Sequence, residues 1–133
     1  MKRNGARQNV GFITSIFLLA LLVVVSGCEQ QHKIAGDYRF EQFEDRYYLH
    51  KRGLDDSQDG GSFIGGVVLR LGWSGKYIVA ERHSFYGGDP DGWMIIVVQT
   101  GVTTGPFTET DLRQHLEIRG IQFYEVNEAW KRL

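Results

Sequence analysis

An apolar run near the N-terminus separates the start of the chain from the part that can fold as a globular domain. The run spans residues 12–25 and follows three basic residues within the first seven positions. Small residues, Ser26 and Gly27, come directly after it. A basic start, an apolar segment of this length and a small-residue cleavage site are the parts of a secretory signal. A membrane-spanning helix needs about 20 apolar residues, so this run is short for a permanent anchor.

The segment Leu22–Cys28 reads L-V-V-V-S-G-C and ends on the only cysteine in the chain. It resembles the lipobox of bacterial lipoproteins. The resemblance implies that the Cys28 thiol receives a diacylglycerol, that residues 1–27 are removed as a signal peptide, and that the new amino group is acylated. An ordinary secretory signal with an incidental cysteine is the alternative. Two or more acyl chains hold a protein stably on a bilayer, so the lipid bilayer is an expected partner.

The residue after the cysteine indicates in which membrane of the cell envelope the protein is anchored. In Gram-negative lipoproteins, an aspartate at that position signals retention in the inner membrane. The residue here is Glu29. By this resemblance, we expect the outer membrane in a Gram-negative cell.

The remaining residues have the size and charge of one acidic domain. Residues 28–35 are expected to form a lipidated tether and residues 36–133 a single domain of about 100 residues. Residues 1–27 carry three basic residues and no acidic one, so their removal lowers the formal net charge from −1 to −4. No basic patch stands out in the sequence, which argues against nucleic-acid binding. With one cysteine, the domain must fold without a disulfide.

Most of the domain shows patterns typical of strands. Short segments rich in aromatic and β-branched residues alternate with Gly- and Asp-containing turns. One of them, Met94–Val98, is apolar throughout and predicts a strand that is buried on both faces and lies centrally in its sheet. Gly65 and Gly66 indicate a bulge or a close backbone approach within another strand. The expected strands span residues 37–41, 46–51, 63–71, 77–82, 93–99 and 102–104.

A helix is predicted over residues 109–119. Thr108 is the expected N-cap, with Asp111 three residues on, and Gly120 suits the left-handed position after the helix. Leu112 and Leu116 would share one face of it. A further short strand at residues 123–124 and a short helix over residues 125–133 are also expected. The fold class is therefore α+β: an antiparallel β-meander of about five or six strands with the 109–119 helix packed on one face.

The stretch from Trp93 to Ile121 combines an apolar strand, a Thr-Gly turn, the sequence Gly105-Pro106-Phe107-Thr108 and an amphipathic helix. It is similar to a unit of small uncharacterised bacterial lipoproteins and related domains of unknown function. The resemblance implies the fold and brings no activity or functional residue with it.

Two acidic loops form a candidate cation site. In an up-and-down meander, the loops 53–61 and 84–92 would emerge at the same end of the sheet. Carboxylate oxygens from two such loops are suitable ligands for Ca²⁺, although Asp and Gly also serve simply as turn residues. The candidate ligands are Asp55, Asp59, Asp89 and Asp91, with Asp56 beside them.

Three aromatic residues in expected turns or loops form a candidate protein-binding surface: Trp73, Phe85 and Tyr86. Exposed aromatics are typical of protein contacts. Serine-nucleophile motifs, phosphate-binding loops and zinc-like histidine spacing are all missing from the sequence. We therefore expect a non-enzymatic envelope lipoprotein, without a cofactor, that binds or supports another envelope protein. A small ligand- or Ca-binding module and a minor envelope hydrolase with a dispersed site are the alternatives.

Overall fold

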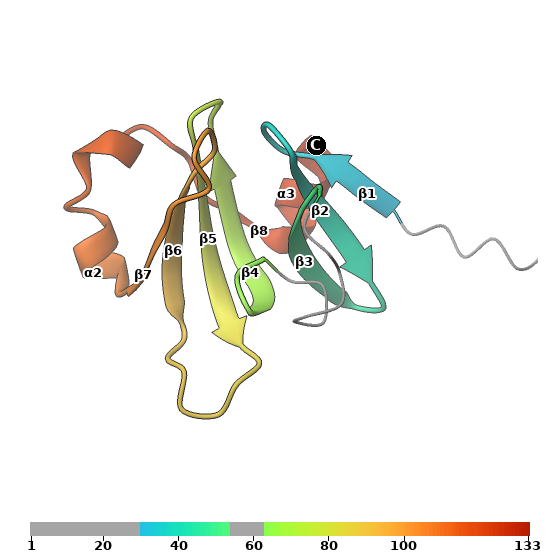
Figure 1. Cartoon of the computed structure of the whole chain (residues 1–133), viewed down its shortest axis with the longest axis horizontal. Helices are drawn as coiled ribbons and strands as arrows, with labels where there is room; N and C mark the ends of the chain where they lie inside the picture. Colours follow the sequence, from blue (N-terminus) through green and yellow to red (C-terminus); the bar gives the residue numbers. More distant parts are fainter. Residues whose placement is uncertain (1–29, 54–62) are drawn as a thin grey trace, which may run out of the picture.

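The computed structural model describes residues 30–53 and 63–133. These residues form two antiparallel sheets, one of three strands and one of five, followed by short helical segments toward the C-terminus. Figure 1 shows the two sheets side by side, with β1, β2 and β3 on the right. The predicted α+β class, with its meander and C-terminal helix, is confirmed.

The three-stranded sheet has the order β1-β2-β3. Its strands are β1 (Gln30–Lys33), β2 (Tyr38–Phe43) and β3 (Arg46–Lys51). The expected polar tether over residues 28–35 is wrong from residue 30 onward, because β1 pairs with β2 along its whole length. A polar strand can pair at a sheet edge, since the ladder uses backbone groups whatever the side chains are. Cys28 lies outside the described residues.

The five-stranded sheet has the order β7-β6-β5-β4-β8, so four consecutive strands form the expected meander. The apolar faces of the two sheets pack on one another, so each sheet buries one of its faces. Of the two alternatives for Gly65 and Gly66, the bulge is wrong, because the strand begins at Gly66 and the register shift lies between Val68 and Arg70. The close backbone approach is present, because a Cβ added at Gly66 would clash with the backbone carbonyl of His83. The strands are β4 (Gly66–Trp73), β5 (Tyr77–Ser84), β6 (Gly92–Val97), β7 (Thr103–Phe107) and β8 (Tyr124–Glu125).

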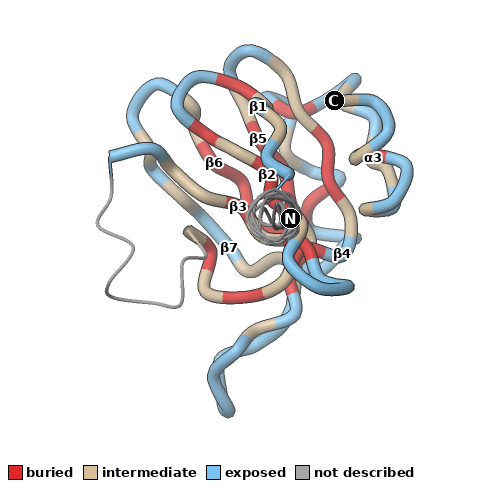
Figure 2. Tube along the Cα trace, turned by 90° about the vertical axis from the view of Figure 1, so that its right-hand side faces the viewer, coloured by how far each residue is buried: buried red, intermediate tan, exposed pale blue. Residues whose placement is uncertain are grey.

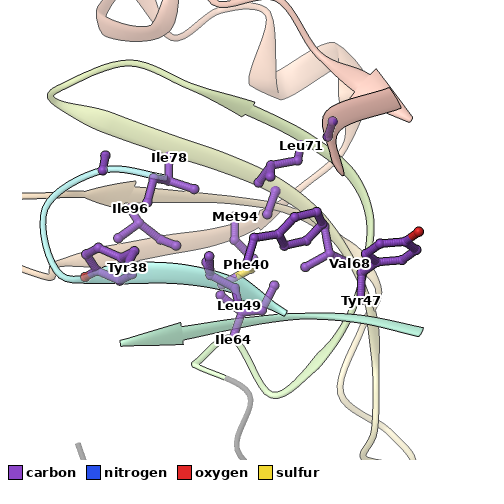
Figure 3. Packing of buried hydrophobic residues seen from close by; sticks show 13 residues of the cluster. Tyr38, Phe40, Tyr47, Leu49, Ile64, Val68, Leu71, Ile78, Met94 and Ile96 are labelled. Carbon is purple, nitrogen blue, oxygen red and sulfur yellow. The ribbon is translucent and has the colours of Figure 1, made fainter. Parts of the chain in front are cut away.

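The main core fills the space between the two sheets (Figure 3). Tyr38, Phe40 and Leu49 point into it from the three-stranded sheet, and each is fully buried. Ile78 and Ile96 meet them from the five-stranded sheet. Residues at alternate positions of β2 and β3 therefore face either this core or the outside.

A second cluster covers the opposite face of the five-stranded sheet. Val79, Trp93 and Ile95 contribute to it from β5 and β6, and Leu112 and Ile118 cover them. All four residues from Trp93 to Ile96 are buried, and β6 lies between β5 and β7. The prediction of a strand that is buried on both faces is confirmed.

The helix predicted over residues 109–119 is interrupted. It consists of α2 (Glu109–Leu112) and a separate 3₁₀ turn, η1 (Leu116–Ile118), with extended backbone at His115. Leu112 and Ile118 both reach the second cluster, a spacing that a continuous helix would place on different faces. Leu116, predicted to share the buried face, is 67% exposed. The burial of Ile118 thus stabilises the interrupted form more than helix formation over residues 109–119 would, because a short helix gains little from its own propensity.

The predicted N-cap is confirmed and Gly120 is left-handed as expected, although the helix itself ends at Leu112. Thr108 Oγ1 accepts a hydrogen bond from the backbone N–H of Asp111 at 3.2 Å and donates to the Asp111 carboxylate at 2.7 Å. Gly120 has a φ of 91°, in the left-handed region. The second expected helix is also present as α3 (Val126–Arg132), preceded by β8. No helix among residues 30–53 and 63–133 is long and apolar enough to cross a membrane.

Candidate protein-binding loop

The loop between β5 and β6, residues 85–91, is anchored by a buried arginine. Arg82, 7% exposed, donates from Nη1 to the backbone carbonyl of Ile64 at 2.5 Å. Its Nη2 donates to the Asp89 carboxylate at 2.6 Å and to the Pro90 carbonyl at 3.4 Å. One side chain therefore connects the β5–β6 loop to the segment that leads into β4. Charge-assisted hydrogen bonds of this kind are stronger than neutral ones.

A second carboxylate closes the base of the loop. Asp91 accepts a hydrogen bond from the backbone N–H of Ser84 at 2.8 Å, and its other oxygen lies 2.8 Å from Nδ1 of His83. The hydrogen bond from Ser84, followed by that with His83, holds the pKa of the Asp91 carboxyl below its usual value. The Ser84 hydroxyl donates to Asp89 and accepts from the N–H of Tyr86. The loop is thus braced by its own side chains.

Two aromatic residues are displayed on this braced loop. Phe85 is 41% exposed and Tyr86 51% exposed, as predicted for loop aromatics. The Phe85 ring lies 6.1 Å from that of Tyr48 on β3, and its N–H donates to the carbonyl of Gly65. Figure 1 shows the loop projecting beyond the end of the five-stranded sheet, at the bottom of the view. Aromatics held rigidly at a surface lose little entropy on binding, so this loop can serve as a protein contact.

The third predicted contact residue, Trp73, is not on a loop. It ends β4, pairs with Ile78 on β5 and packs against the main core. Its ring lies 5.8 Å from that of Tyr124. The prediction of an exposed turn there is wrong because the strand continues two residues further, and the turn is closed by Ser74 instead.

The acidic loops do not form a cation site within the described residues. The N–H of Phe85 donates to the carbonyl of Gly65, so the β5–β6 loop lies beside the segment that leads into β4. However, Asp89 pairs with Arg82 and Asp91 with His83, so both carboxylates are engaged by this chain's own groups. Among residues 30–53 and 63–133, no group of three or more His, Cys, Asp or Glu could hold a metal ion. The other candidates, Asp55, Asp56 and Asp59, lie outside the described residues.

The described histidines each have a separate partner. His83 Nδ1 lies 2.8 Å from Asp91, and His115 Nδ1 lies 2.8 Å from Glu117. The others make the contacts His50–Glu41 and His32–Trp130.

Two glutamates near α2, Glu81 and Glu109, share Arg70 as a hydrogen-bond donor. Arg70 donates to Glu81 at 2.6 Å and to Glu109 at 3.2 Å, and its guanidinium lies 4.6 Å from the centre of the Trp93 ring. Hydrogen bonds from Arg113 and Arg70 hold the pKa of Glu109 below its usual value. A general acid needs a raised pKa, so this cluster has the character of a structural ion-pair network.

Sequence reasoning missed Arg82, the residue that organises the loop. In sequence, Arg82 continues an alternating strand and gives no sign of burial. A charged residue at an inward position, followed seven residues later by Asp89, is a weak signal that could have indicated the pair. Comparisons of the chain with protein-family models, with curated proteins and with solved structures found no match.

Proposed function

We propose that this chain is a lipid-anchored protein of the bacterial cell envelope that binds another envelope protein through its β5–β6 loop. The signal-like start and Cys28 support the anchor. The binding role rests on one observation: Phe85 and Tyr86 are exposed on a loop that the buried Arg82 fixes in place. Rigid aromatic anchors carry much of the binding energy in protein interfaces.

The surface around the loop supports this proposal. Asp89 and Asp91 are satisfied inside the loop, so a partner would not have to desolvate unpaired carboxylates there. Tyr48 extends the aromatic surface onto β3 through its contact with Phe85. The partner is therefore expected to offer an apolar pocket to the two rings.

Photo-crosslinking in living cells tests the binding role. A photo-reactive residue at Gly87, where an added Cβ meets no atom within 4 Å, should give a discrete adduct with one envelope protein. The same residue at Gly75, which is equally open, serves as the position control. The adduct should disappear in the variant Phe85→Ser/Tyr86→Ser. It should persist in Val102→Ser/Leu116→Ser, which removes exposed apolar side chains elsewhere.

Two results would contradict the binding role. One is a pattern of adducts that is the same from positions 87 and 75. The other is a position-87 adduct that survives the loss of both loop aromatics. Either result would favour the alternative function, a small ligand- or cation-binding module.

A further inference from the structure

The three-stranded sheet has a second face that lies outside the main core. Phe40 and Leu49 point into the core, so their sequence neighbours on β2 and β3 point the other way. We call the part of this face with the most exposed side chains the outer face and define it by five residues, all exposed except the half-buried Arg39: Gln31, Lys33, Arg39, Phe43 and Arg46. The less exposed residues Glu41, Tyr48 and His50 share this side of the sheet, and Tyr48 lies at its border with the β5–β6 loop. Figure 1 places this sheet on the right, and Figure 2 views the molecule from that side.

The outer face carries three cations that have no carboxylate partner among the described residues. Lys33 lies directly opposite Arg39 in the β1–β2 ladder, and Arg46 lies opposite Phe43 in the β2–β3 ladder. None of the three cations forms an ion pair within the described part of the chain. Like charges directly opposite one another destabilise a sheet, so this pairing favours an anionic partner outside the domain.

The carboxylates near the outer face do not neutralise its three cations. Glu41 also belongs to this side of β2, but it is buried and its carboxylate lies 2.5 Å from Nε2 of His50. Asp37 lies in the β1–β2 turn, and Glu44 and Asp45 form the β2–β3 turn, so these three exposed carboxylates lie beyond the ends of the strands. The strands themselves therefore present a local basic surface on a domain whose net charge is negative.

The position of β1 brings the proposed anchor to the same side. Gln30 pairs with Gln42, next to Phe43, and β1 runs antiparallel to β2. The chain before Gln30 therefore leaves beside the β2–β3 turn. Cys28 precedes Gln30 by two residues, which span at most about 7 Å. Lipid attached to Cys28 must enter the bilayer close to Phe43, whose side chain is 54% exposed.

We propose that the outer face rests on the bilayer surface, where Lys33, Arg39 and Arg46 bind the phosphate groups of lipid headgroups and Phe43 enters the headgroup boundary. Basic residues near an anionic bilayer are attracted to it over about a Debye length. The acyl chains supply the affinity, and the cations supply the orientation. This inference rests on the acylation of Cys28 in the proposed function. It places α2 and η1, at the left of Figure 1, on the side away from the membrane.

Depth-dependent fluorescence quenching tests the orientation. Gln31→Cys on the outer face and Gln114→Cys after α2 are matched exposed positions. Acylation blocks the Cys28 thiol, so each new cysteine is the single site for a fluorescent label. The acylated full-length product is placed in phosphatidylcholine–phosphatidylglycerol vesicles with a headgroup-attached quencher. We expect roughly threefold stronger quenching at position 31 than at position 114, and a smaller difference at about 1 M salt, where screening is strong.

Charge variants test the role of the cations. Lys33→Gln/Arg46→Gln should reduce the difference between the two labels to near unity. Lys76→Gln/Arg119→Gln makes the same change in net charge at exposed positions elsewhere and should leave the difference unchanged. Inorganic phosphate added to the buffer at matched ionic strength should not reproduce the effect of the first variant, because the contact is with a bilayer.

The possible failures are distinguishable. Equal quenching at positions 31 and 114 in an acylated chain overturns the orientation and leaves the anchor intact. A difference that survives Lys33→Gln/Arg46→Gln overturns headgroup binding by these cations. A chain whose Cys28 carries no acyl group, shown by its mass, overturns the proposed anchor and this inference with it.

Discussion

Lys33 lies directly opposite Arg39 across the β1–β2 ladder, and neither side chain has a carboxylate partner in the described part of the chain. Two cations at a directly paired position repel each other. The phosphate groups of lipid headgroups, the partner proposed for this surface, would offset that repulsion.

The first prediction concerns this pair. Lys33→Glu should stabilise the folded protein by about 0.5 kcal/mol, because it replaces repulsion with attraction opposite Arg39. Urea denaturation of the protein in detergent measures the change, and Lys76→Glu at an exposed turn is the control. If Lys33→Glu is less stable than that control, the pairing of Lys33 with Arg39 does not destabilise the sheet. The same variant should weaken the preferential quenching at position 31.

The second prediction concerns a glycine in β4. A Cβ added at Gly72 would lie 2.6 Å from the Phe123 ring and 2.7 Å from the carbonyl oxygen of Gln122. Gly72→Ala should therefore destabilise the protein by about 2 kcal/mol, since overpacking forces backbone to move. Gly75→Ala, with open space around it, should change stability by no more than roughly 0.5 kcal/mol. Similar thermal transitions for the two variants would contradict the close approach of residues 121–123 to β4.

The third prediction concerns the arginine that anchors the loop. Arg82→Met should reduce stability by about 2–3 kcal/mol, because it leaves the Ile64 carbonyl without its donor and the Asp89 carboxylate without its charged partner. It should also weaken the crosslink from position 87, even though Phe85 and Tyr86 are unchanged. Arg119→Met, at an exposed position, is the control. Full crosslinking in the Arg82 variant would mean that the bracing is not needed for binding.

The fourth prediction is a pH dependence. The hydrogen bonds from Ser84 and His83 lower the pKa of Asp91 in the folded protein. Its contribution to stability is therefore fully present above the carboxyl's ordinary pKa and is lost as the pH falls through the lowered folded value. The stability difference between wild type and Asp91→Asn should shrink toward zero in acid. A difference that stays constant from neutral to acidic pH would contradict the assignment.

Local sequence signals predicted individual elements well. The strand over residues 46–51 has the predicted bounds, the apolar run near Met94 lies in a strand buried on both faces, and Thr108 caps a helix as expected. These features depend on side chains within a few positions of one another. The signals are therefore present in any short window of the sequence.

Features that depend on distant packing were not predictable in the same way. The helix over 109–119 is interrupted because Ile118 is drawn to the second cluster. The outer-face cations stand on three different strands, so they form a basic surface only once the ladders fix their register. Arg82 on β5 donates to the carbonyl of Ile64, which lies before β4 and 18 positions earlier in the chain. Each of these follows from tertiary contacts that periodicity does not encode.

The acyl anchor at Cys28 is tested most directly by the intact mass of the protein extracted from membranes, together with the mass of its N-terminal peptide. We predict a chain that begins at Cys28 and carries a thioether-linked diacylglycerol and an amide-linked acyl group. Cys28→Ser should remain unacylated and should not be held by the membrane. A wild-type chain that keeps residues 1–27, or that begins elsewhere without lipid, would contradict the account of an acyl anchor placed beside β1.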